Sequence, residues 1–121
     1  MQNAAKTSGS IAEQTASPRE LEADLLLQAA SCLQAAQDGW DKTKPDLDQA
    51  LLYNRKLWII ILSSVTSAEN PLPTDIRQNF ANLGLFVMNQ TLSLISNPRP
   101  EALNSLITIN RELAAGLRGQ A

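Results

Sequence analysis

Two stretches of this chain repeat one pattern of apolar positions, and each carries an Asn-Arg pair within the pattern. The first stretch has the positions Leu47, Ala50, Leu51, Asn54, Leu57, Trp58 and Ile61. The second stretch, 56 residues further on, has the positions Leu103, Leu106, Ile107, Asn110, Leu113, Ala114 and Leu117. Offsets of 3, 4, 7, 10, 11 and 14 residues place each set on one face of an α-helix. The pattern therefore predicts two packed helices, each with a buried amide that must find hydrogen-bond partners.

Capping and helix-breaking residues predict where four helices begin and end. The run Ser17-Pro18-Arg19-Glu20 joins a capping serine, a proline suited to the first helical position and a capping-box glutamate. A first helix is therefore expected from there to Gly39. The other helices are expected at about 46–67, 74–96 and 101–117, separated by proline-containing breaks.

The other two helices also have predicted apolar faces. The first helix is expected to bury Leu21, Leu25, Ala29, Cys32, Leu33 and Ala36, and the third Ile76, Phe80, Leu83, Val87 and Leu94. Gly84 lies inside the third helix, where it indicates either a close approach of another helix or a small bend. Short connections between four helices predict an all-α fold, an antiparallel helical bundle. We expect a mobile N-terminal arm at 1–16, one helical domain at 17–118 and a tail at 119–121.

Composition narrows the possible functions and compartments. The formal charge is −2, and the ten Lys and Arg residues are scattered, which disfavours a nucleic-acid-binding protein. The single cysteine cannot form an internal disulfide and is expected to be a small buried residue in a reducing compartment. No targeting segment and no membrane-spanning run is visible, so we expect a soluble, cytoplasmic protein without membrane insertion.

Catalytic chemistry is thinly represented in the sequence. There is no histidine, no glycine-rich phosphate loop and no activated nucleophile. The cluster Asp41, Asp46 and Asp48 is best explained as solvated charge at a helix start. We therefore expect no catalytic residues, no metal site, no cofactor and no enzymatic activity.

Apolar residues also lie off the main faces of the second and third helices. They are Leu52, Ile59, Ile60 and Leu62 in the second helix, and Leu85, Phe86, Met88 and Leu92 in the third. A helix that is apolar on most sides is either central in its domain or covers a partner. Two explanations therefore stay open: a core enclosed by the outer helices, or a groove that binds an amphipathic helix of a partner.

The Asn-Arg pairs have two interpretations as well. In the first, each Asn fixes the register of its helix and each Arg packs its stem and pairs at the surface. In the second, the amides and guanidinium groups face a groove and recognise a partner. Under the second interpretation Trp58 is a partly exposed interface anchor. The candidate partner-binding residues are Asn54, Arg55, Leu57, Trp58, Ile61, Arg77, Phe86, Asn110 and Arg111.

Five pieces of this sequence, in the same order and at comparable spacing, resemble the FlaF family. They are the capped start at 17–23, the segment at 50–58, the residues Leu72-Pro73, Ile76-Arg77 and Asn79, the residues Asn82-Leu83 and Phe86-Val87, and the end at 106–118. The likeness extends from about Ser17 to Arg118. FlaF proteins belong to the flagellar systems of alphaproteobacteria and are regarded as regulators of flagellar biosynthesis.

The resemblance implies a cytoplasmic chaperone that binds monomeric, unassembled flagellin and supports its secretion. It also implies a functional link to FlbT, the companion regulator of flagellin expression. Flagellin ends are helical in the filament and disordered before assembly, so an apolar groove suits them. An alternative is a post-transcriptional regulator of flagellin synthesis acting together with FlbT, and a third is a structural homodimer formed through the surplus apolar surface.

Overall fold

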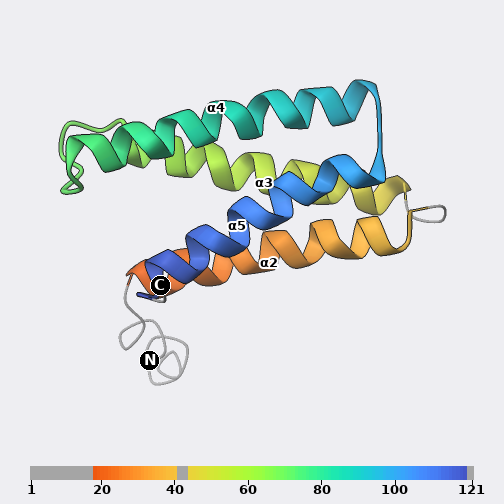
Figure 1. Ribbon diagram of the computed structural model, residues 1–121, viewed down its shortest axis with the longest axis horizontal. Coiled ribbons are helices and arrows are strands. Elements are labelled where there is room, and N and C mark those ends of the chain that lie inside the picture. The colour runs from red at the N-terminus through yellow and green to blue at the C-terminus, as the bar shows by residue number, and fades with distance from the viewer. Residues whose placement is uncertain (1–17, 41–43, 120–121) are drawn as a thin grey trace, which may run out of the picture.

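The computed structural model describes residues 18–40 and 44–119 of the chain and confirms the predicted all-α fold. The described residues form four successive helices: α2 (Pro18–Asp38), α3 (Lys44–Val65), α4 (Thr74–Ser96) and α5 (Leu103–Leu117), the last preceded by the 3₁₀ turn η1 (Pro100–Ala102). Successive helices run in opposite directions (Figure 1). The predicted N-terminal arm lies outside the described residues, so the division of the chain into arm, domain and tail stays a prediction.

The predicted helix boundaries hold to within two residues. The first helix begins at Pro18, α3 begins at Lys44 rather than near Asp46, and α4 begins at Thr74 as expected. The fourth helix opens as a 3₁₀ turn at Pro100, which suits a proline because its missing N–H has no intrahelical partner there.

The core lies where α3 and α5 meet α2. Both repeated apolar faces are packed as predicted, with Ile61, Leu113 and Leu117 half-buried and the other members of the two stripes buried. In the bundle, α2 packs against both α5 and α3, whereas α4 packs mainly along α3 (Figure 1). Consequently α5 starts beside the end of α4 and diverges from it towards its own end.

The predicted apolar face of the first helix is wrong at three positions, because Leu21, Leu25 and Cys32 are exposed. The buried residues of α2 are Ala23, Leu26, Ala29, Ala30, Leu33 and Ala36. Four of these six are alanines, and small side chains at a contact let two helix axes come close together. A face of small residues suits α2 because it must accommodate both α3 and α5.

Gly84 lies at a close approach between α4 and α3, which decides between the two sequence-based interpretations of this glycine. A Cβ atom added to Gly84 would lie 2.7 Å from Cγ of Leu62, and the other two nearest atoms belong to the same side chain. Because the conflict reaches the branch carbon of Leu62, rotation of its methyl groups alone does not relieve it.

We therefore expect Gly84→Ala to destabilise the protein by up to about 2 kcal/mol, because an overpacking cost of about 1–3 kcal/mol exceeds the roughly 1 kcal/mol gained in helix propensity. Urea unfolding followed by circular dichroism measures this change. In a Leu62→Ala background the same substitution is expected to become neutral or stabilising. A stabilising Gly84→Ala in the natural chain would contradict the close approach.

Candidate functional site

The two asparagines of the repeated pattern meet each other in the core. The Nδ2 group of Asn110 on α5 donates to Oδ1 of Asn54 on α3 at 2.7 Å, and the indole Nε1 of Trp58 donates to Oδ1 of Asn110 at 3.0 Å. All three side chains have 0% exposure. The equal spacing of the two stripes thus brings their amides together between α3 and α5. The Nδ2 group of Asn54 is buried without a hydrogen-bond partner among the described residues.

Burial overturns the expectation that Trp58 is a partly exposed anchor. Leu57 is also buried, so of the candidate binding residues on α3 only Arg55 is exposed, and Ile61 is half-buried. The close neighbour of α3 is α2 rather than α5, so space is left between α3 and α5. The indole of Trp58 fills this space, and the core therefore needs a large side chain at position 58. These buried residues act on a binding surface only through the helices that they hold in place.

Arg77 and Arg111 have partners within the protein. The Nη1 group of Arg77 donates to the backbone oxygens of Val65, at 3.4 Å, and Ser67, at 2.9 Å, which satisfies carbonyl groups at the end of α3. Arg111 is exposed on α5, and its Nη2 group lies 3.4 Å from Oε1 of Gln34 on α2. The structure therefore does not bring the candidate arginines together at one surface.

The divergence of α4 from α5 opens an apolar cleft at one end of the bundle. We call this the end cleft. One hollow of about 480 Å³ is lined by Leu72, Pro73, Ile76, Phe80, Glu112, Leu113, Gly116 and Leu117. A second hollow of about 290 Å³ shares three of these residues and reaches inward to Leu26, Ile61 and Val65. Carboxylates are present at the lining of each hollow, Glu112 in the first and Glu22 in the second.

Four apolar residues of the end cleft lie at positions where helical spacing predicts burial. Ile76, Phe80, Leu113 and Leu117 were all placed on buried helix faces, but Ile76 is exposed and the other three are half-buried. Periodicity identifies the apolar face of a helix, whereas the angle at which a neighbouring helix leaves that face depends on the whole bundle. Of the candidate binding residues, Ile61 alone lines this cleft.

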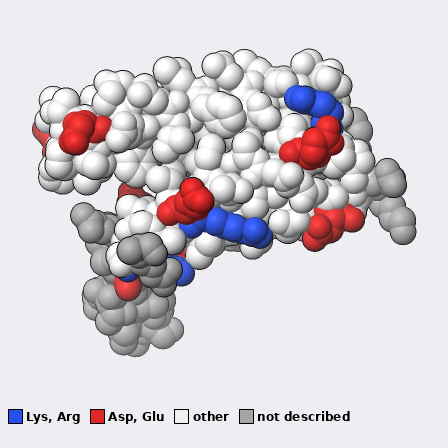
Figure 2. All heavy atoms as spheres, viewed as in Figure 1, with Lys and Arg blue, Asp and Glu red and all other residues white. Residues whose placement is uncertain are grey.

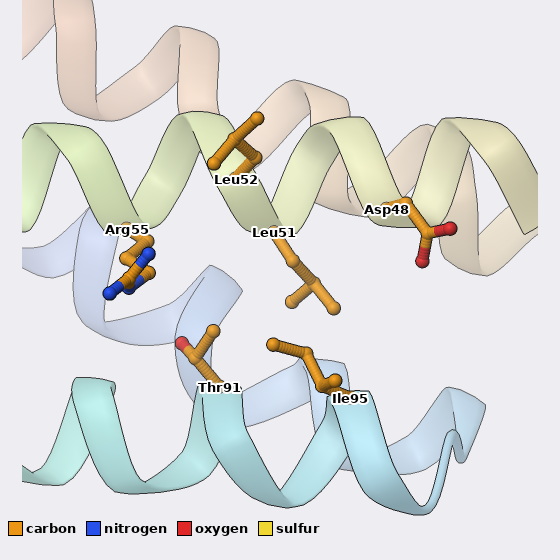
Figure 3. A pocket seen from close by; sticks show the side chains of 6 residues that line it. All are labelled: Asp48, Leu51, Leu52, Arg55, Thr91 and Ile95. Carbon is orange, nitrogen blue, oxygen red and sulfur yellow. The ribbon is translucent and has the colours of Figure 1, made fainter.

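A separate hollow lies between α3 and α4, away from the end cleft. This α3–α4 groove has a volume of about 390 Å³ and is lined by Asp48, Leu51, Leu52, Arg55, Thr91 and Ile95 (Figure 3). The hydroxyl of Thr91 donates to the backbone oxygen of Val87 at 2.7 Å, so its proton is already used within α4. Arg55 makes no hydrogen bond or ion pair with another described residue.

The surplus apolar residues of α3 and α4 are largely at the surface, which agrees with one of the two explanations left open by the sequence. Leu52, Ile59, Ile60, Leu85, Phe86 and Leu92 are exposed, while Leu62 and Met88 are half-buried. No Asp, Glu, Lys or Arg occurs between Arg77 and Arg99. Figure 2 shows the resulting uncharged surface over α4, with charged groups at its two ends. Exposed apolar residues on an uncharged face mark it as a candidate surface for binding another protein.

Metal-ligating side chains are not clustered in the part of the chain that the structure describes. The described residues contain no group of three or more His, Cys, Asp or Glu side chains that is arranged to hold a metal ion. Cys32 lines a shallow hollow between α2 and α3. None of the helices in the described part of the chain has both the length and the apolar character needed to cross a bilayer.

Comparisons with known proteins assign the chain to a family. No curated protein and no solved structure matches it. The family model described as flagellar protein FlaF matches residues 5–117, which is nearly the whole chain and includes the four helices of its described part. The chain is therefore a member of the FlaF family of flagellar proteins.

Proposed function

We propose that this flagellar protein binds unassembled flagellin in the cytoplasm and supports its secretion as a chaperone. The observation that carries the proposal is the end cleft, an apolar opening between α4 and α5 with Ile76, Phe80, Leu113 and Leu117 on its walls. A concave apolar surface without catalytic groups favours binding over catalysis. We accordingly propose that the protein has no enzymatic activity.

The shape of the end cleft suits one face of an amphipathic helix. Helices α4 and α5 form its two walls, and α3 supplies Ile61 and Val65 at its floor. A helix that lies in such a groove buries apolar side chains spaced three and four residues apart. Flagellin ends fold as helices only on assembly, so binding here would cover their apolar faces beforehand through coupled folding. The carboxylates of Glu22 and Glu112 favour a segment with a basic residue beside its apolar face.

The decisive experiment is calorimetry of the full chain against monomeric flagellin from the same organism. We expect saturable binding that disappears when one end of flagellin is removed. Ile76→Asp is expected to weaken binding by about tenfold or more, because the new carboxylate must lose water in an apolar contact. An aspartate in the first turn of α4 is favourable to the helix, so the fold is expected to persist.

Ile60→Asp is the matched control for this experiment. Ile60 is 66% exposed on α3 and lines neither the end cleft nor the α3–α4 groove, so its replacement is expected to leave flagellin binding unchanged. Equal binding by the Ile76→Asp variant and the natural chain would place flagellin elsewhere on the protein. Absence of flagellin binding by the natural chain would favour the alternative, regulation of flagellin synthesis together with FlbT.

A further inference from the structure

The α3–α4 groove has an arrangement of charge that matches a second copy of itself. Asp48 lies at one end of the groove and Arg55 at the other, with Leu51, Leu52 and Ile95 between them (Figure 3). The two charged residues are seven positions apart on α3, two helical turns or roughly 10 Å along the axis, and therefore share one helix face. A surface with opposite charges at its two ends and apolar side chains at its centre is complementary to its own two-fold rotated image.

We propose that two copies of this chain associate through the α3–α4 groove about a two-fold axis beside Leu52. Midway between positions 48 and 55 lies the boundary of Leu51 and Leu52, so rotation about an axis there places Arg55 of each copy opposite Asp48 of the other. The same rotation places Leu52 of one copy against Leu52 of the second copy. Two helical hairpins, α3–α4 from each copy, then face each other as in a four-helix bundle.

The apolar residues around the groove supply the contact area for this association. Leu52 and Ile59 share the face of α3 with the two charges, at offsets of 4 and 11 from Asp48. Leu85, Leu92 and Ile95 share one face of α4, at offsets of 7 and 10 from Leu85, and are 60–62% exposed. These residues leave a strip of apolar surface in water that the second copy covers.

The charges of this face are compatible with a second copy of it. Like charges that face each other across an interface cost affinity. Here α4 carries no charged residue between Arg77 and Arg99, and the two charged residues that line the groove have opposite sign. The two-fold arrangement therefore pairs each of these charges with its opposite. Arg55, which has no partner among the described residues of its own chain, gains one.

Light scattering of the purified full chain tests this proposal, with charge reversal as the discriminating variant. We expect a dimer that dissociates on dilution. Arg55→Asp alone brings two carboxylates together at each end of the interface, and Asp48→Arg alone brings two guanidinium groups together there. Each single variant is therefore expected to weaken association by about tenfold or more. An equimolar mixture of the two variants is expected to form a heterodimer, because both pairs are again of opposite sign.

Two further variants separate this interface from other effects. Ile95→Glu is expected to abolish the dimer and Ile60→Glu to leave it intact, while both keep the helical circular dichroism of the natural chain. Flagellin binding, which the end cleft serves, is expected to survive Ile95→Glu, so the two proposals succeed or fail separately. A natural chain that stays monomeric at high micromolar concentration would overturn the proposal. The proposal would also be overturned if the two single charge variants dimerised as the natural chain does. The same holds if each single variant is monomeric and their mixture fails to associate.

Discussion

Trp58→Ala is expected to lower the free energy of unfolding by about 3–5 kcal/mol, the cost of truncating a large buried aromatic side chain. Trp58 is the largest of the fully buried side chains and fills the space between α3 and α5. Its removal also takes away the indole group that donates to Oδ1 of Asn110 at 3.0 Å. Because a domain of this size is stable by only about 5–15 kcal/mol, the variant is expected to lose a large fraction of its stability.

Urea unfolding followed by circular dichroism at 222 nm measures the effect, and two controls divide it into its causes. Trp58→Phe keeps most of the volume but loses the donor, so it is expected to cost about 1–3 kcal/mol. Trp40→Ala is the matched substitution at a half-buried tryptophan just after α2, and its cost is expected to be smaller. A loss below about 1 kcal/mol for Trp58→Ala would show that the indole is not needed for the core.

This result also bears on how Trp58 is interpreted in a binding assay. The sequence alone left Trp58 between an interface anchor and a core residue, and its 0% exposure places it in the core. Reduced flagellin binding by Trp58→Ala is therefore expected to accompany reduced helicity or stability. Ile76→Asp, which changes the surface of the end cleft, is expected to reduce binding without that loss.

The sequence predicted α3 and α5 more accurately than α2, for a physical reason. The stripe of α5 contrasts with polar residues on its other faces, and α3 repeats the same spacing around its own Asn-Arg pair, so the buried positions of both helices, including Asn54 and Asn110, followed from spacing alone. In α2, alanines and leucines occupy most faces, and several apolar stripes fit the 3.6-residue period about equally well. Which stripe is buried is then decided by the close approach of neighbouring helices, which favours small residues.

The candidate sites were less predictable than the fold because they depend on relations between helices. Exposure of Leu52, Ile59, Leu85 and Leu92 was one of two explanations that the surplus apolar residues left open. By contrast, the end cleft exists because α5 packs along α2 rather than along α4. No local sequence pattern in either helix specifies which neighbour α5 packs against. The charged residues of the α3–α4 groove, Asp48 and Arg55, can be read from the sequence. Only the structure shows that Ile95 of α4 lies between them and that the three residues share one groove.

The second large effect is expected at the buried amide pair. Asn110→Ala is expected to cost about 3 kcal/mol or more, because it leaves the indole N–H of Trp58 and the whole amide of Asn54 buried without partners. A buried polar group that loses its partner keeps the full cost of leaving water. Denaturant unfolding measures this loss, and Ser105→Ala, at a half-buried position on the same helix, is the control with a small expected effect.

Removing the complete polar group is expected to cost much less than removing one member. In the triple variant Asn54→Leu, Asn110→Leu, Trp58→Phe no buried donor or acceptor of this group remains, and leucine branches at Cγ as asparagine does. Replacement of all partners by apolar groups of similar shape is typically near neutral in stability. We therefore expect the triple variant to be more stable than Asn110→Ala alone. A triple variant as unstable as the single one would show that shape, rather than hydrogen bonding, dominates at this site.

If stability is nearly preserved, the role of the amide pair must lie in specificity. The hydrogen bond from Asn110 to Asn54 forms only when α3 and α5 hold one register, whereas leucines in a bundle core tolerate sliding of one helix along another. We expect the triple variant to keep its helicity but to give broadened amide signals in nuclear magnetic resonance spectra. Because α5 forms one wall of the end cleft, such sliding would also weaken flagellin binding without unfolding the protein. Sharp spectra and unchanged binding in the triple variant would show that the apolar residues alone set the register.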